Sequence, residues 1–277
     1  QPSATGANAI AIGDSALASG LRGMSLGFSS TASGEDSSAL GNATAAGDAS
    51  AAVGFYAETT SAASGSVAMG YGAYCTGPMA AALGRQPIAA GENSVALGKS
   101  YASGEYSIAA QITNNTSSYG AQGPSSIAMG YQAKTNTGAD YALAIGHSAQ
   151  STGDYCVAIG YSTSAAQVAS LALGYDSTGN GSYGVAIGYQ ANCAAEKSVA
   201  LGDNTQTSAT NSFAFGKQSK TQVLGKYAYA SGQFAAAGDA QGGQFVLRAD
   251  TTDATATVLT TNNSAAGNDD QIVANSD

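Results

Sequence analysis

The chain contains no tryptophan, 1 histidine, 3 cysteines and 4 prolines, and only 10% of its 277 residues are charged. So little large or charged side-chain mass argues against an ordinary globular domain with a thick core. The cysteines lack the spacing of a metal site or a disulfide framework. A single histidine leaves little from which to build a nucleophile paired with a base. We therefore expect no enzyme, no cofactor and no bound metal.

Positive charge is also scarce, because 9 lysines and arginines stand against 18 acidic residues and leave a net charge of -9. A chain this acidic is a poor partner for nucleic acid or an anionic membrane surface. No apolar run approaches the ~18 residues that a membrane-spanning helix needs, so we expect no membrane insertion. The sequence opens on Gln1 and Pro2 without an initiator methionine or a signal peptide. We therefore expect a processed chain or a fragment of a longer protein.

Glycine is abundant, with 37 residues, and it is accompanied by much alanine, serine and threonine. Many glycines end a four-residue motif, as in VAIG at residues 185–188, VALG at 199–202 and FAFG at 213–216. The motif occurs in 15 copies between residues 10 and 216, mostly 13 to 16 residues apart. A second half-repeat of small residues, such as ALASG at 16–20, places another glycine about seven residues after the first.

Two apolar residues on either side of a different one form a period-two pattern, which is typical of a short strand. The glycine permits the positive-φ turn that a tight corner requires. Two short strands and two turns every ~14 residues describe one coil of a β-solenoid, in which each strand pairs with its equivalent one coil away. We predict an all-β fold, with a parallel β-roll over residues 1–216 and a β-rich cap or junction over residues 217–277. Large aliphatic side chains of one strand are expected to fill the core against small ones of the other.

The residue between the two apolar positions is alanine in 14 of the 15 copies and Ser25 in the other. By strand alternation we expect it to point away from the core, where a lone solenoid tolerates almost any polar residue. Alanine is common in this chain, but abundance alone does not explain its fixed phase. A continuous alanine ribbon favours close contact with identical chains around a closed symmetry axis. The predicted interface comprises Ala39, Ala68, Ala96, Ala128, Ala144, Ala158, Ala172, Ala186 and Ala200.

Aromatic residues directly follow several of the turn glycines. Because equivalent positions stack coil upon coil, Tyr161, Tyr175 and Tyr189 are predicted to form an aromatic ladder. Such a row can bind sugars or protein partners, and it can equally cover the turn or pack between subunits. His147 occupies the same slot and is expected to be a solvated variant of it. The candidate binding row comprises Phe28, Phe55, Tyr71, Tyr131, Tyr161, Tyr175 and Tyr189.

The phased SVALG and S-x-A-x-G pattern, from residue 9 to about residue 216, resembles the head repeat of trimeric autotransporter adhesins. That repeat is a left-handed parallel β-roll built as a homotrimer. The resemblance implies that three copies of this chain associate, with the alanine ribbon at the trimer interface. It also implies an extracellular protein that attaches to a cell-surface glycan or protein receptor.

From residue 217 the repeat weakens, and alternating stretches at 244–248 and 255–261 indicate a region that closes the end of the solenoid. This region resembles the segment that follows such repeats in the fibres of bacteriophages and large viruses. We therefore expect a viral or phage tail fibre, with other fibre or virion proteins as partners and a location on the virion surface. The alternatives are a fragment of a bacterial trimeric adhesin on the cell surface and a purely structural spacer in a longer fibre.

Two further stretches interrupt or imitate known patterns. Residues 112–126, ITNNTSSYGAQGPSS, form an insertion between two copies of the repeat. Insertions in solenoids map to surface loops, which often carry binding, and a tolerated insertion without a function is the alternative. The stretch GNGSYG at residues 179–184 matches a dinucleotide-binding pattern. It lies in a repeat turn with no helix expected after it, so the context excludes that function.

Overall fold

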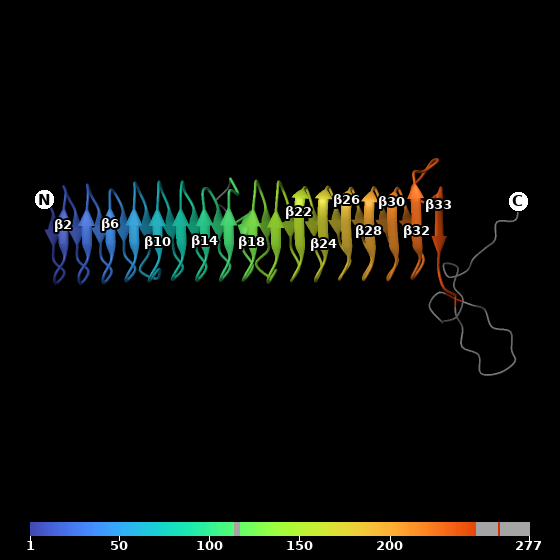
Figure 1. Ribbon diagram of the computed structural model, residues 1–277. Coiled ribbons are helices and arrows are strands. Elements are labelled where there is room, and N and C mark those ends of the chain that lie inside the picture. The colour runs from blue at the N-terminus through green and yellow to red at the C-terminus, as the bar shows by residue number, and fades with distance from the viewer. Residues whose placement is uncertain (114–116, 248–259, 261–277) are drawn as a thin grey trace, which may run out of the picture. The chain divides into compact units, whose positions relative to one another are not determined.

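The computed structural model describes residues 1–113, 117–247 and 260, and every regular element within them is a β-strand. The chain divides into two compact units, Gln1–Tyr155 and Cys156–Asp277. In each unit the short strands stack side by side, coil upon coil (Figure 1). Successive coils are offset by about 14 residues, so that Ser3 pairs with Leu17 and Leu17 with Thr31. The predicted all-β parallel solenoid is confirmed.

Each coil of the first unit contributes a three-residue strand and a two-residue strand, and each strand pairs in parallel with its equivalent in the next coil. The three-residue strands are β2 (Ile10–Ile12), β4 (Met24–Leu26), β6 (Ser38–Leu40), β8 (Ala51–Val53), β10 (Val67–Met69), β12 (Ala81–Leu83), β14 (Val95–Leu97), β16 (Ile108–Ala110), β18 (Ile127–Met129) and β20 (Leu143–Ile145). The two-residue strands are β1 (Ser3–Ala4), β3 (Leu17–Ala18), β5 (Thr31–Ala32), β7 (Thr44–Ala45), β9 (Glu58–Thr59), β11 (Tyr74–Cys75), β13 (Ile88–Ala89), β15 (Tyr101–Ala102), β17 (Gly120–Ala121), β19 (Lys134–Thr135) and β21 (Gln150–Ser151).

The second unit repeats this arrangement with longer strands, which extend through the turn glycine. Its five-residue strands are β22 (Val157–Tyr161), β24 (Leu171–Tyr175), β26 (Val185–Tyr189), β28 (Val199–Asp203), β30 (Phe213–Lys217) and β32 (Tyr227–Ser231). Its two-residue strands are β23 (Ser164–Ala165), β25 (Thr178–Gly179), β27 (Asn192–Cys193), β29 (Gln206–Thr207) and β31 (Lys220–Thr221). A last strand, β33 (Gln241–Gln244), follows.

The parallel coils continue past residue 216, where the sequence placed their end. Strand β32 still pairs in parallel with β30, with Phe213 opposite Tyr227. The chain then reverses, and β33 pairs antiparallel with β32, placing Tyr227 opposite Gln244. The repeat thus extends one coil further than predicted, although Ala230 replaces the turn glycine there. Of the stretches predicted to alternate, residues 244–247 and 260 are described; Gln244 belongs to a strand and Thr260 forms a single bridge. Residues 248, 255–259 and 261 lie outside the described residues.

The interior of each unit is filled by alanine, serine, threonine and cysteine side chains. Among the described residues the largest fully buried side chain is Ile112, followed by threonines. Where the second strand brings a threonine, a serine lies opposite and shares a hydrogen bond with it. The Ser198 and Thr207 hydroxyls lie 2.8 Å apart, and those of Ser212 and Thr221 lie 2.7 Å apart. The core is therefore a narrow seam of small groups in which most hydroxyls are paired, although those of Ser94, Thr163 and Thr205 are buried without a hydrogen-bond partner.

The prediction that large aliphatic side chains fill this seam is wrong. The middle alanine of the motif points inward, and Ala172 is 0% exposed. Its aliphatic neighbours point outward, as Ile10 and Ile12 do with 51% and 61% of their surface exposed. Strand alternation places the middle alanines and the flanking aliphatic residues on opposite sides of the strand, and the narrow interior has room only for the alanines.

The turn glycines form a ladder of their own along each unit. Gly174 has φ +121°, which L residues rarely adopt, and a Cβ added there would meet the carbonyl oxygen of Gly188 in the next coil. Both the backbone angle and the close approach of neighbouring coils therefore require glycine.

We predict that Gly174→Ala lowers the free energy of unfolding by about 1–3 kcal/mol, since strain of this kind typically costs that much. Chemical denaturation followed by circular dichroism measures the change. The matched control is Gly232→Ala, because Gly232 has no atom within 4 Å of an added Cβ and no left-handed φ. Equal stability of the two variants would contradict the role given to the ladder.

Candidate functional site

Each unit carries a stripe of mostly large apolar side chains on its outer surface, and we call these stripes the aliphatic ridge. It consists of the outward-facing first and third residues of the strands β2 to β20 in the first unit and β22 to β32 in the second. None of these side chains is buried except the small Ala110, and many are well exposed, such as Met69 at 48% and Leu201 at 40%. Among its members in the second unit are Val157, Ile159, Leu171, Leu173, Val185, Ile187, Val199, Leu201, Phe213 and Phe215. Contiguous exposed apolar surface of this kind marks an interaction site.

The alanines predicted to form the interface between chains do not lie on this surface. Each of them is 0% exposed and packs inside the coil of its own chain, so its side chain cannot reach a second copy. The residues concerned are Ala39, Ala68, Ala96, Ala128, Ala144, Ala158, Ala172, Ala186 and Ala200. On these strands, only the outward-facing residues beside the alanines are available to contact a second copy.

The aromatic row forms the predicted ladder. The ring centroids of Tyr161 and Tyr175 lie 4.9 Å apart and those of Tyr175 and Tyr189 lie 5.1 Å apart, and in both pairs the rings are stacked with nearly parallel planes. All three side chains are about half exposed. The parallel register of β22, β24 and β26 imposes this stacking, because it pairs the three tyrosines directly.

The remaining members of the row lie in the first unit. Phe55 stacks on Tyr71 with centroids 5.8 Å apart, and Tyr131 stacks on His147 at 4.8 Å. Phe28 belongs to the same turn position and is 64% exposed. His147 therefore replaces an aromatic ring in the row, as predicted, and its Nδ1 lies 3.1 Å from the Ser148 hydroxyl.

A second aromatic row lies on the opposite turn, and sequence reasoning missed it. Tyr141 and Tyr155 stack with centroids 5.2 Å apart, and Tyr106 and Tyr183 occupy equivalent exposed positions. All four have φ near +55°. In the sequence each of these tyrosines lies at the same spacing ahead of an apolar-Ala-apolar motif, and that regular spacing could have predicted the second row.

Ion pairs between neighbouring coils lie on the exposed turns. Arg22 Nη2 contacts a Glu35 carboxylate oxygen at 2.8 Å, and Arg22 Nε contacts Asp36 at 2.6 Å. The Arg22 hydrogen bond lowers the pKa of the Asp36 carboxyl below its usual value. Because these groups are solvated, they tune the local charge of the turns more than they stabilise the fold.

The described residues offer no evident catalytic constellation. No group of three or more His, Cys, Asp or Glu side chains within them could hold a metal ion. Residues 179–184, the dinucleotide-like stretch, begin in β25 and continue into a turn. Cys75, Cys156 and Cys193 are fully buried, and burial raises the pKa of the Cys75 thiol to about 11. In the described part of the chain, no helix has the length and apolarity to cross a membrane.

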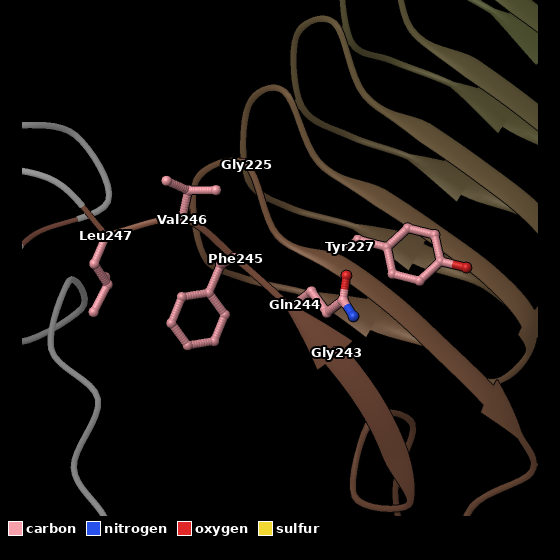
Figure 2. A pocket seen from close by; sticks show the side chains of 7 residues that line it. All are labelled: Gly225, Tyr227, Gly243, Gln244, Phe245, Val246 and Leu247. Atoms are coloured by element: carbon pink, nitrogen blue, oxygen red, sulfur yellow. The ribbon is translucent and has the colours of Figure 1, made fainter.

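A hollow of about 730 Å³ lies beside the last coil, and its lining includes Tyr227 and residues 243–247. Figure 2 shows Phe245, Val246 and Leu247 along the segment that follows β33, with Tyr227 on the adjoining strand. Val246 is 78% exposed. Phe245, Val246 and Leu247 make much of the lining apolar, and Tyr227 and Gln244 contribute its polar side-chain groups.

We predict that the cysteines resist alkylation in the folded protein, because all three are buried. The Cys75 thiol, whose pKa burial raises to about 11, also stays protonated at neutral pH. Mass spectrometry after iodoacetamide treatment at pH 7.5 should find unmodified chains. The same treatment in denaturant should add a label at each of the 3 cysteines. Rapid labelling of the folded protein would contradict the burial described above.

The fold and its surface define the class of protein: a repeat solenoid with a small-residue core and an apolar outer face. Residues 4–30, 18–42, 76–100, 121–146, 138–163, 165–191 and 194–219 match the YadA head domain repeat, which spans two copies per match. These matches cover more than half of the chain and occur in both units. The chain therefore belongs to the YadA head repeat family of trimeric autotransporter adhesins, as the sequence pattern suggested. A comparison with curated proteins gave no match.

Proteins of this family are extracellular adhesins that form homotrimers and bind molecules on host surfaces. The family is in general non-enzymatic. Membership in the family identifies this chain as an adhesin-like head.

Proposed function

We propose that the chain assembles as a homotrimer through the aliphatic ridge and serves as a non-enzymatic attachment fibre. The ridge is the observation that carries this proposal. In one chain its side chains stay partly in water, although burying a Leu, Ile or Val side chain contributes about 1.5–3 kcal/mol. Closed symmetry around an axis would cover the ridge of every copy with the same surface of its neighbours.

The aromatic row supports attachment as the task of the assembled fibre. Tyr161, Tyr175 and Tyr189 present rings and hydroxyls at regular intervals on an exposed turn. A trimer would repeat such weak contacts three times, which raises avidity without new contacts. We propose a cell-surface glycan or protein receptor as the target.

Such a fibre is consistent with two locations, the surface of a virion and the surface of a bacterial cell. The resemblance of residues 217–277 to segments of phage and viral fibres supports a virion fibre that works with other fibre proteins. The head repeats themselves support a bacterial cell-surface adhesin, which is the second candidate. A purely structural spacer would share the trimer but show no attachment of its own.

We predict that Leu171→Asp combined with Val185→Asp converts the trimer to a folded monomer, because both side chains face outward on the ridge. Light scattering on a sizing column should fall from three chain masses to one, 27.0 kDa. Circular dichroism should stay unchanged.

Two controls separate assembly from folding. Ser164→Asp with Thr178→Asp alters the outward face of the other sheet and should leave the trimer intact. Ala172→Asp places a charge in the seam and should unfold the coil. A monomeric wild type, or a trimer that survives the ridge variant, would overturn the proposed assembly.

We predict that replacing Tyr161, Tyr175 and Tyr189 together with serine lowers attachment several-fold and leaves the trimer mass unchanged. Binding of the fluorescent chain to cultured animal cells and to bacterial cells measures attachment and distinguishes the kinds of target. Because the ladder is exposed on a turn, the substitution should not disturb the seam.

The control replaces Tyr106, Tyr141 and Tyr183 on the opposite turn, which should preserve attachment. Loss of the trimer in the ladder variant would show that the row packs between subunits instead. Wild-type trimer without attachment to any cell would favour the structural spacer.

A further inference from the structure

The first unit contains a hollow of about 520 Å³ whose lining includes Arg85, Lys99, Gln111, Thr113 and Tyr131. These residues come from four successive coils, after the strands β12, β14, β16 and β18. An adjoining hollow of about 370 Å³ extends it towards the aliphatic ridge beside Leu97 and Met129. Sites of this volume accommodate small ligands.

The hollow exists because two neighbouring coils depart from the repeat. The turn between β14 and β15 is one residue shorter than the turn between β12 and β13. In the next coil Ala110 stands where a large ridge side chain is usual, and Gln111 replaces the turn glycine. An added Cβ at Gly98 would meet nothing within 4 Å, whereas one at Gly84 would meet the next coil at 3.0 Å. The glycine ladder therefore opens between Gly98 and Gln111.

The charge of this hollow is opposite to that of the chain. Arg85 and Lys99 follow turn glycines of adjacent coils, both side chains are exposed, and neither takes part in an ion pair among the described residues. Of the six other described lysines and arginines, Arg22, Lys197 and Lys217 each contact a carboxylate. Two uncompensated cations beside a hollow favour an anionic ligand, and a guanidinium matches a carboxylate or sulfate in two hydrogen bonds.

The uncharged groups around the two cations restrict the chemical class of the ligand further. Gln111 and Thr113 supply an amide and a hydroxyl, which hydrogen-bond alcohols, and Tyr131 supplies a ring held by its stack on His147. A sugar ring offers hydroxyls for the first two and a C–H face for the third. We propose that this hollow binds an acidic saccharide, one that carries a carboxylate or sulfate group. The inference rests on the proposed attachment function, for which it names one ligand class and one site.

Isothermal titration of the full chain with three probes tests the proposal: 3′-sialyllactose, a heparin-derived disaccharide and lactose. At least one acidic probe should bind, and its affinity should fall with added salt, whereas neutral lactose should bind at least tenfold more weakly. The two acidic probes distinguish a carboxylate from a sulfate ligand. Equal binding of lactose, or no binding of either acidic probe, would overturn the site.

Three variants locate the binding. Arg85→Gln with Lys99→Gln should weaken the acidic probe at least tenfold. Ala110→Leu should also weaken it, without a change of charge, by filling the adjoining hollow with the usual ridge side chain. Lys197→Gln is the matched control for losing a cation elsewhere, and it should bind normally. Unchanged binding in both hollow variants would refute the site. If these variants lose the saccharide but still attach to cells, the site stands and the receptor contact lies elsewhere on the fibre.

Discussion

The narrowness of the coil is the constraint on which the rest of the structure depends. Its two strands face each other across a seam that holds little more than methyl, hydroxyl and thiol groups, and Ala172 and Ala186 are both 0% exposed within it. Large apolar side chains have no room inside, so they occupy the outward positions of the same strands. The chain thereby exposes the residues that most proteins bury, and a single copy gains little from the hydrophobic effect. The proposed assembly would make that free energy available.

Backbone hydrogen bonds between coils supply the order that the small core cannot. Each strand pairs in register with its equivalents, and turn residues add further bonds, such as Asp176 N–H to the Tyr161 carbonyl at 2.8 Å. Glycine at the corner lets adjacent coils approach closely enough for this pairing. The same register stacks every surface position into a row, which is why one tyrosine per coil becomes a ladder. The backbone register thus forms the surface rows. Their chemistry depends on the residue type at each surface position, which the fold does not constrain.

The sequence predicted the coil length, the strand positions, the turn glycines and the tyrosine ladder, because each follows from period and register. It did not predict which side of the strand faces inward. Alternation is symmetric, and the general preference for large aliphatic residues in a core gave the wrong answer at Ala158 and Val157. The deciding quantity was the width of the seam, which depends on both strands together. The recurring small residue was the available signal for it, since a position that is alanine in 14 of 15 copies and serine in the other fits an interior of constant, narrow width.

The hollow beside Arg85 and Lys99 escaped sequence analysis for a related reason. A shortened turn, Ala110 and Gln111 were each readable as a lapse in the repeat, and their joint effect appears only when adjacent coils are stacked. In a solenoid each coil contacts only its neighbours, so a departure in one coil is not transmitted along the unit. A cavity can therefore be opened at one turn while the ladder closes normally on both sides, as it does at Gly84 and Gly130. The regular coils form a rigid scaffold. Ligand specificity must therefore come from the coils that depart from the repeat.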